Sequence, residues 1–166
     1  YALHADPRTG GYLMWSDTLA SLSRLLSALA ISTAIALVAG VVVGLLPIAG
    51  ASFGPVIAVA SMVPPLALLP ILFIIMGLGE ASKITLIVVG TALKLTRDLI
   101  LRVQELPREQ IIKAQTLGAS TWQIAVRIVI PQMLPRLIDA LRLEIGPAWL
   151  FLIAAEAIAA DSGLGY

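Results

Sequence analysis

Residues 25–79 read LLSALAISTAIALVAGVVVGLLPIAGASFGPVIAVASMVPPLALLPILFIIMGLG, and none of them is charged. One helix needs about 20 apolar residues to cross the hydrocarbon core of a bilayer, so this stretch is long enough for more than one span. It is interrupted by residues that break or turn helices: Pro47, Gly50, Gly54 and Pro55. We therefore expect two membrane-spanning helices, at about 18–46 and 56–77, joined by a tight turn.

The composition of the whole chain also indicates a membrane protein. Of its 166 residues, 59% are hydrophobic and 13% are charged, whereas soluble domains carry about 25% charged residues. The net charge is +1, which gives no indication of a nucleic-acid partner. There is no cysteine and only one histidine, His4. Thiolate chemistry and cysteine-ligated metals are thereby excluded, and we expect neither a catalytic site nor a metal site.

Small residues and prolines mark the two apolar spans. The first span has a small residue at every fourth position: Ala36, Gly40 and Gly44. Such a row permits close approach of another helix, unless it only reflects the high glycine content of membrane helices. The second span contains Pro64, Pro65 and Pro70. It should be a kinked helix that either lines a pathway or is simply bent.

The third expected span, at about 83–101, carries charges. Lys94 lies near its middle, with Arg97 and Asp98 one turn later. Ionisable residues within membrane helices are costly and usually face a water-filled path or a partner. Lys94 therefore either lines a substrate pathway or pairs with another charge, for instance Glu144.

The fourth expected span, at about 135–160, carries Asp139, Arg142, Glu144 and Glu156, and Glu156 lies among small and apolar neighbours. A carboxylate in such surroundings should be protonated, paired or hydrated. From polarity and position in the last two spans, we predict a substrate pathway lined by Lys94, Arg142, Glu144, Trp149 and Glu156.

Between the third and fourth spans lies a polar stretch, residues 107–131, with the sequence PREQIIKAQTLGASTWQIAVRIVIP. We expect two short helices hinged at Gly118, because glycine readily ends a helix in the left-handed conformation. Ser120 and Gln123 form the pattern of a capping box at the start of the second helix. That helix should stop or bend at Pro131.

We call this stretch, residues 107–131, the elbow. Its first helix has an apolar stripe, in which Ile111, Ala114 and Leu117 recur at helical spacing. The elbow is either a solvent-exposed connector or a docking surface for a soluble partner. Positive residues flank it: Arg97, Arg102, Arg108, Lys113, Arg127 and Arg136. The positive-inside rule then makes the elbow cytoplasmic. With four spans, both chain ends lie outside, and residues 1–17 form a loop beyond the bilayer.

The elbow resembles the coupling loop, or EAA motif, of the permease subunits of bacterial ABC importers. The resemblance rests on AQTLGAS at 114–120, followed by Ile130 and Pro131. Further stretches are similar to the nitrate/sulfonate/taurine-type permeases: SLSR at 21–24, VPPLALLP at 63–70, GLGEASK at 77–83, AE at 155–156 and SGLGY at 162–166. The resemblance covers the chain from about Leu22 to its end. It implies coupling roles for Ala114, Leu117, Gly118, Ala119 and Pro131.

Members of that family usually have six spans, so the resemblance implies that residues 1–166 are a single permease domain without its first and last spans. It implies a multi-pass protein of the bacterial inner membrane, in contact with lipid, that imports a small anionic solute such as a sulfonate, taurine or nitrate. Its expected partners are a second permease copy, a periplasmic or lipid-anchored binding protein, and ABC ATPase subunits that hold ATP and magnesium.

The sequence departs from the family pattern at four positions. The motif glutamate falls on Ile112 and the next alanine on Lys113, while Lys94 stands where relatives often have proline and Glu144 where they have a small residue. The alternative to an ABC permease is a channel or an ion-gradient-driven transporter, with Lys94, Glu144 and Glu156 as a proton relay. An enzyme is not expected, and the chain has no phosphate-binding loop ending in Gly-Lys-Ser/Thr.

Overall fold

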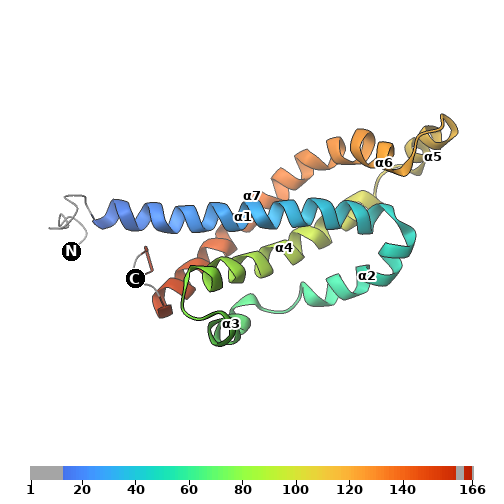
Figure 1. Ribbon diagram of the computed structural model, residues 1–166. Helices are drawn as coiled ribbons and strands as arrows, with labels where there is room; N and C mark the ends of the chain where they lie inside the picture. The colour runs from blue at the N-terminus through green and yellow to red at the C-terminus, as the bar shows by residue number, and fades with distance from the viewer. Residues whose placement is uncertain (1–12, 160–162, 166) are drawn as a thin grey trace. The chain divides into compact units, whose positions relative to one another are not determined.

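The computed structural model describes residues 13–159 and 163–165, and in this part of the chain every regular element is a helix, as predicted (Figure 1). The expected loop at residues 1–17 lies largely outside the described residues, although its last residues already belong to α1. In chain order the elements are α1 (Leu13–Leu45), α2 (Pro47–Ala60), the 3-10 helix η1 (Pro65–Leu68), α3 (Leu69–Met76), α4 (Glu80–Gln104), α5 (Arg108–Thr116), α6 (Thr121–Ile124), the π-helix η2 (Ala125–Val129) and α7 (Ile130–Ala159).

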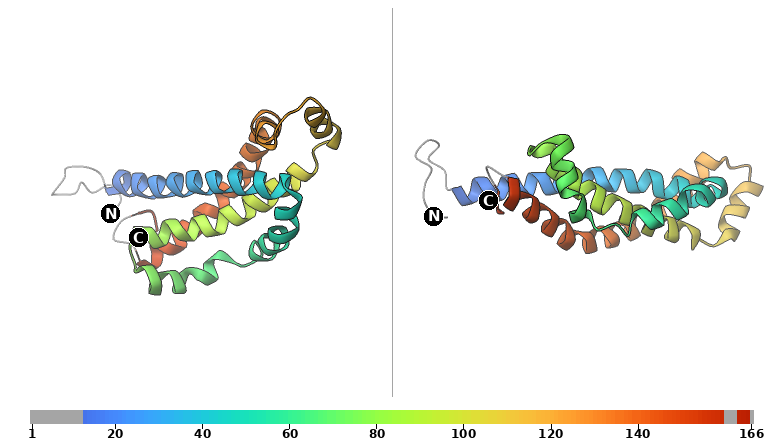
Figure 2. Two further views of the ribbon diagram at one scale, coloured as in Figure 1. Left: turned by 45° about the vertical axis from the view of Figure 1, so that its right-hand side comes forward. Right: turned by 90° about the horizontal axis from the view of Figure 1, so that it is seen from below.

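The contacts divide the chain into two compact units. The first unit comprises Tyr1–Ile31, Pro64–Gly90 and Ile145–Tyr166, and the second comprises Ser32–Val63 and Thr91–Glu144. Helices α1, α4 and α7 each contribute one part to each unit. The predicted elbow lies wholly within the second unit, where α5 and α6 follow the end of α4 (Figure 2).

The apolar stretch turns at Leu46, before the predicted start of the second span at residue 56. Only Leu46 separates α1 from α2, and Pro47 occupies the first turn of α2, where its missing N–H is tolerated. The second predicted span is instead broken between Ala60 and Pro65. The reason is that Pro64 and Pro65 remove two successive backbone donors, and Pro64 is extended, with ψ of 118°.

Within the described residues, one helix is by itself long and apolar enough to cross a membrane, the part of α1 from Trp15 to Leu45. The segments Pro47–Ala60 and Pro65–Met76 reach this standard only as a sharply bent pair, which is a broken span or a re-entrant loop. Helices α4 and α7 match the predicted third and fourth spans in position. Four spans therefore remain a prediction.

Close packing in the second unit confirms the prediction from the small-residue row. A Cβ atom built on Gly40 would lie 2.6 Å from Leu99 Cβ, and one on Gly44 would lie 2.7 Å from Val103 Cβ. The same two helices share a buried hydrogen bond, 2.7 Å long, from Thr91 Oγ1 to Ser32 Oγ. Glycine is thus required where α1 crosses α4.

Gly40→Ala in the full-length chain is expected to lower the free energy of unfolding by about 1–3 kcal/mol, because its Cβ would overlap an atom attached directly to the α4 backbone. Thermal unfolding in detergent measures this loss as a lower midpoint. The matched control is Gly54→Ala in α2, where nothing lies within 4 Å of the added atom. Equal midpoints for the two variants would contradict the prediction.

Candidate functional site

The elbow is a fixed turn, as its sequence predicts. Gly118 has φ of +80°, and its N–H donates to the carbonyl of Gln115 over 2.9 Å. The next N–H, of Ala119, donates to the carbonyl of Ala114 over 3.0 Å. This pair of bonds is a Schellman motif, which satisfies the last carbonyls of α5.

The capping box that begins α6 is also present. The Ser120 hydroxyl accepts the Gln123 backbone N–H over 3.3 Å, and the Gln123 side-chain oxygen accepts the Ser120 backbone N–H over 2.8 Å. Both helix ends at the elbow therefore have hydrogen-bonded caps, which fixes the angle between α5 and α6.

The apolar stripe predicted on α5 is largely covered by the chain itself. Ile111 and Ala114, with Ala119, pack against a buried cluster formed by Val41, Val103, Ile124, Val129 and Met133. Leu117 is different, because 88% of it is exposed. The three most exposed apolar side chains of the elbow are Ile112, Leu117 and Trp122, which we call the elbow face. The sequence analysis missed Trp122, although an aromatic residue next to a helix cap was a signal.

Pro131 does not end the second elbow helix. Helices α6, η2 and α7 follow one another without a break, and the Ile130 N–H bonds to the carbonyl of Ala125, five residues earlier. A proline ring collides with the carbonyl four residues before it. The π-turn shifts the hydrogen-bond pattern just before Pro131, so the helix continues.

A glutamine that the sequence analysis did not consider links α5 to the start of α7. Gln132 Nε2, in the first turn of α7, donates to Gln110 Oε1 on α5 and to the carbonyl of Ile128, each over 3.0 Å. Gln132 is therefore placed to hold α5 in a fixed position against α7.

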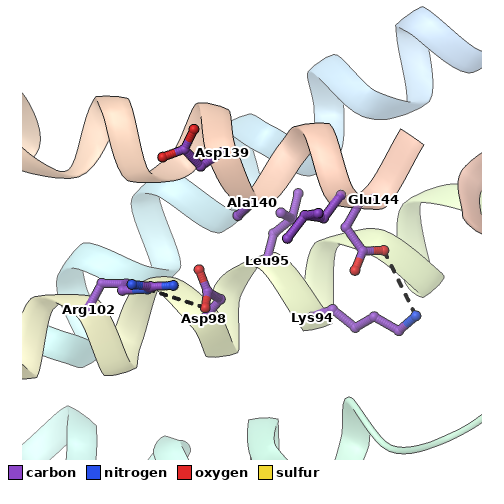
Figure 3. A pocket seen from close by; sticks show the side chains of 8 residues that line it. Lys94, Leu95, Asp98, Arg102, Asp139, Ala140 and Glu144 are labelled. Carbon is purple, nitrogen blue, oxygen red and sulfur yellow. Dashed lines mark ion pairs between the residues drawn. The ribbon is translucent and has the colours of Figure 1, made fainter. Parts of the chain in front are cut away.

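A polar pocket of about 190 Å³ lies between α4 and α7 in the second unit (Figure 3). Its charged lining consists of Lys94, Asp98, Arg102, Asp139 and Glu144. Lys94 Nζ lies 3.9 Å from Glu144 Oε2, and Arg102 Nε lies 3.5 Å from Asp98 Oδ1. The pairing proposed for Lys94 and Glu144 is confirmed, and the same two side chains line a cavity.

The other residues predicted to line a pathway lie elsewhere. Arg142 is exposed on α7 and does not line this pocket. Trp149, which is half-buried, and Glu156 belong to the first unit. The structure thus brings together two of the five predicted pathway residues.

Glu156 is paired, one of the three possibilities considered for it. Its side chain is fully buried, and Arg24 Nη1 lies 2.7 Å from its Oε1. The hydroxyl of Ser21 donates to the same carboxylate over 2.8 Å, and the N–H of Gly165 donates to Oε2 over 3.1 Å. Arg24 also pairs with Glu80 at the start of α4.

The segment 163–165 folds back over this cluster. The N–H of Gly163 donates to Asp17 Oδ1 over 3.1 Å, and the N–H of Leu164 donates to the Ser21 hydroxyl over 3.0 Å. Gly163 has φ of +127°, and a Cβ there would lie 2.6 Å from the Glu156 carboxyl carbon. Described residues from three of the stretches that carry the family resemblance therefore meet at the Glu156 carboxylate. Arg24 links them to Glu80 in a fourth stretch.

Glu80 is the exposed member of this cluster, with 56% of its side chain accessible. Lys83 Nζ lies 3.3 Å from Glu80 Oε1. Burial favours the protonated carboxyl, but the hydrogen bonds and charges of Arg24 and Lys83 outweigh it and hold the pKa of Glu80 below its usual range. A signal for this cluster existed in the sequence, because Arg24 and Glu80 bracket the uncharged stretch.

Comparison with known proteins gives relatives over most of the chain. The taurine transport system permease protein TauC of Escherichia coli (strain K12) is 36% identical over 153 residues, which cover 92% of this chain and 56% of that protein. The nitrate import permease protein NrtB of Synechococcus elongatus is 30% identical over 148 residues, 89% of this chain and 53% of that protein. The chain thus spans about half the length of these two relatives.

A shorter match joins the chain to the putative aliphatic sulfonates transport permease protein SsuC of Escherichia coli (strain K12), with 33% identity over 104 residues, or 63% of this chain and 40% of that protein. The family model for the binding-protein-dependent transport system inner membrane component matches residues 32–166, which include the whole elbow. The chain therefore belongs to the family of inner-membrane components of binding-protein-dependent transport systems.

Proposed function

We propose that this chain is the permease subunit of an ATP-driven importer and forms part of the pathway for a small solute that carries an acid group. The named relatives support the solute class, because taurine, aliphatic sulfonates and nitrate all carry an acidic or anionic group. The family match does not favour the gradient-driven alternative. The single observation that carries the proposal is the elbow face. It is a rigid, exposed apolar surface on a chain that belongs to a family of transport components.

The partners follow from this role. An ABC ATPase, which binds ATP and magnesium, covers the elbow face from the cytoplasm. A second copy of the permease completes the pathway, and a periplasmic or lipid-anchored binding protein delivers the solute. The protein crosses the inner membrane several times. The Arg and Lys residues around the elbow support its cytoplasmic position.

The elbow is suited to transmit force, because both of its helices are capped and Gln132 links α5 to α7. When ATP closes the ATPase pair, a rigid elbow moves as one body. That motion reaches α4 directly before the elbow and α7 directly after it. These two helices also carry the polar pocket, so the motion of the ATPase reaches the solute path.

The double variant Leu117→Asp/Trp122→Asp tests this function, since charges on the elbow face would oppose docking into an apolar groove. In the full-length chain co-expressed with its ATPase, we expect at least a tenfold loss of co-purified ATPase. Gln115→Glu, which adds a negative charge at an exposed polar position of α5, is the matched control. ATPase recovery that is unchanged in the double variant, or the absence of any co-purifying ATPase, would refute the proposal.

A further inference from the structure

A second cavity, of about 460 Å³, lies in the second unit where the start of α5 meets the ends of α1 and α4. It is larger than the polar pocket and shares no lining residue with it. Most of its lining is apolar, and this part consists of Gly44, Leu45, Pro47, Val103, Leu106 and Ile111. The cavity is therefore suited to a hydrocarbon chain rather than to a small polar solute.

The cavity lies at the level where the apolar part of α1 ends. The part of α1 that is long and apolar enough to cross a membrane runs from Trp15 to Leu45, and Leu45 lines the cavity. Directly after it, Leu46 and Ile48 are exposed at the turn into α2. Apolar side chains exposed beside the end of a span can contact lipid acyl chains. We call this space the interfacial cavity, because it lies between the span and the polar elbow.

Two polar side chains complete the lining of the interfacial cavity. They are Gln104, at the end of α4, and Arg108, at the start of α5, and both are exposed. Among the described residues that line the cavity, Arg108 carries the only charge. Glu105 and Glu109 are close to it in sequence but do not line the cavity. The polar end of the cavity thus has one positive charge and a side-chain amide.

The start of α5 adds backbone donors at this polar end. Arg108 is the first residue of α5, and Pro107 before it provides no side-chain cap. The N–H groups in the first turn of such a helix remain available, and the helix dipole favours an anion there. A guanidinium group, an amide and an uncapped helix start therefore meet at the rim of an apolar cavity.

From this combination we propose that the interfacial cavity binds an anionic phospholipid. Arg108 and Gln104 would donate hydrogen bonds to its phosphate, and an acyl chain would pack against Leu45, Pro47 and Leu106. Basic pockets between helices on the cytoplasmic side of a membrane suit the head groups of such lipids. This site goes beyond the proposed function, and only its cytoplasmic level rests on that function, through the orientation of the elbow.

A lipid bound here would also help to hold the elbow in place. Val103 belongs to the buried cluster beneath the elbow, and Ile111 packs against that cluster from α5. Both residues also line the interfacial cavity. An occupied cavity would therefore oppose any movement of α5 away from the cluster.

Competition between two lipids tests the charge of the ligand. The full-length chain in a neutral detergent is offered equal amounts of phosphatidylglycerol, which is anionic, and phosphatidylcholine with the same acyl chains. Native mass spectrometry then counts the lipids that the protein retains. We expect phosphatidylglycerol to be retained about tenfold more than phosphatidylcholine.

Arg108→Gln should lower this preference at least threefold, because it removes the only charge in the described lining. Lys113→Gln is the matched control, since it removes a positive charge from an exposed residue of α5 that does not line the cavity. Equal retention of the two lipids by the unsubstituted chain would overturn the proposal. Equal losses of preference in the two variants would do so as well.

A thiol in the lining tests the location of the lipid. The 166 residues contain no cysteine, so Leu106→Cys provides one thiol in the cavity once any cysteine outside these residues is replaced. An uncharged methanethiosulfonate reagent should react at least fivefold more slowly after phosphatidylglycerol is added. At Gln115→Cys, exposed on α5 and outside the cavity, the rate should change less than twofold. Equal slowing at both positions would contradict the site. A Leu106→Cys thiol that never reacts would also contradict it, since the cavity would then be closed.

Glycerol phosphate distinguishes a lipid from a soluble phosphate, because it offers the anionic group without acyl chains. If it protected Leu106→Cys as well as phosphatidylglycerol does, the site would bind soluble phosphates and the lipid proposal would fall. These tests use the permease without its ATPase, so their failure leaves the proposed function standing. Conversely, failure of an ATPase to co-purify would refute that function and leave lipid binding intact.

Discussion

Arg24→Ala should lower the free energy of unfolding by about 3–5 kcal/mol, the largest stability effect expected in the first unit. The variant removes the cation that pairs with Glu156, whose side chain is fully buried. It also removes a partner of Glu80, which is less costly because that carboxylate is 56% exposed and keeps Lys83 nearby. Thermal or denaturant unfolding of the full-length protein in detergent measures the loss.

The double variant Arg24→Met/Glu156→Gln separates loss of the charge pair from loss of packing. Glutamine keeps an oxygen that can accept from Ser21 and Gly165, and the buried carboxylate charge is removed together with its cation. We therefore expect the double variant to be more stable than Arg24→Ala. A loss below about 1 kcal/mol in Arg24→Ala would show that Glu156 does not depend on its cation.

Gly118→Val should uncouple the importer, the largest functional effect expected from a single residue. At φ of +80° a β-branched side chain is strained even though nothing lies within 4 Å of its Cβ, so the Schellman turn should open. The intrinsic strain is about 1–2 kcal/mol, but the change in elbow angle displaces the elbow face. We expect at least a tenfold loss of solute-stimulated ATP hydrolysis in the assembled importer.

The size of the effect should follow backbone preference rather than side-chain volume. Gly118→Asn should be mild, because asparagine tolerates the left-handed conformation, whereas Gly118→Ala should be intermediate. Gly146→Ala in α7 is the matched control, with open space around it and ordinary helical φ. Full coupling in Gly118→Val would contradict a rigid elbow.

Local chemistry explains why the elbow could be predicted residue by residue. Gly118, Ser120 and Gln123 act through bonds that span three to five residues, and those bonds are visible as spacing in the sequence. The pairing of Arg24 with Glu156 spans 132 residues. Helical periodicity carries no information about such a pair, so only its possible existence was predicted.

The errors in the fold prediction have the same origin. The spacing of Ile111, Ala114 and Leu117 shows that they share a helix face, but not that the chain itself covers the first two. Prolines show a similar limit. Pro64 and Pro65 in succession break a helix, whereas Pro131 is accommodated by a π-turn that begins six residues earlier. Tertiary context decides between these outcomes.

The π-turn at Ala125–Val129 affects the direction in which the elbow face points around the helix axis. Each residue of an α-helix advances the side-chain direction by about 100°. One extra residue in the π-turn therefore rotates everything before Ala125 relative to everything after Ile130, while the helix itself remains continuous. The direction of the elbow face relative to the pocket wall on α7 is thus set by a single residue of helical phase.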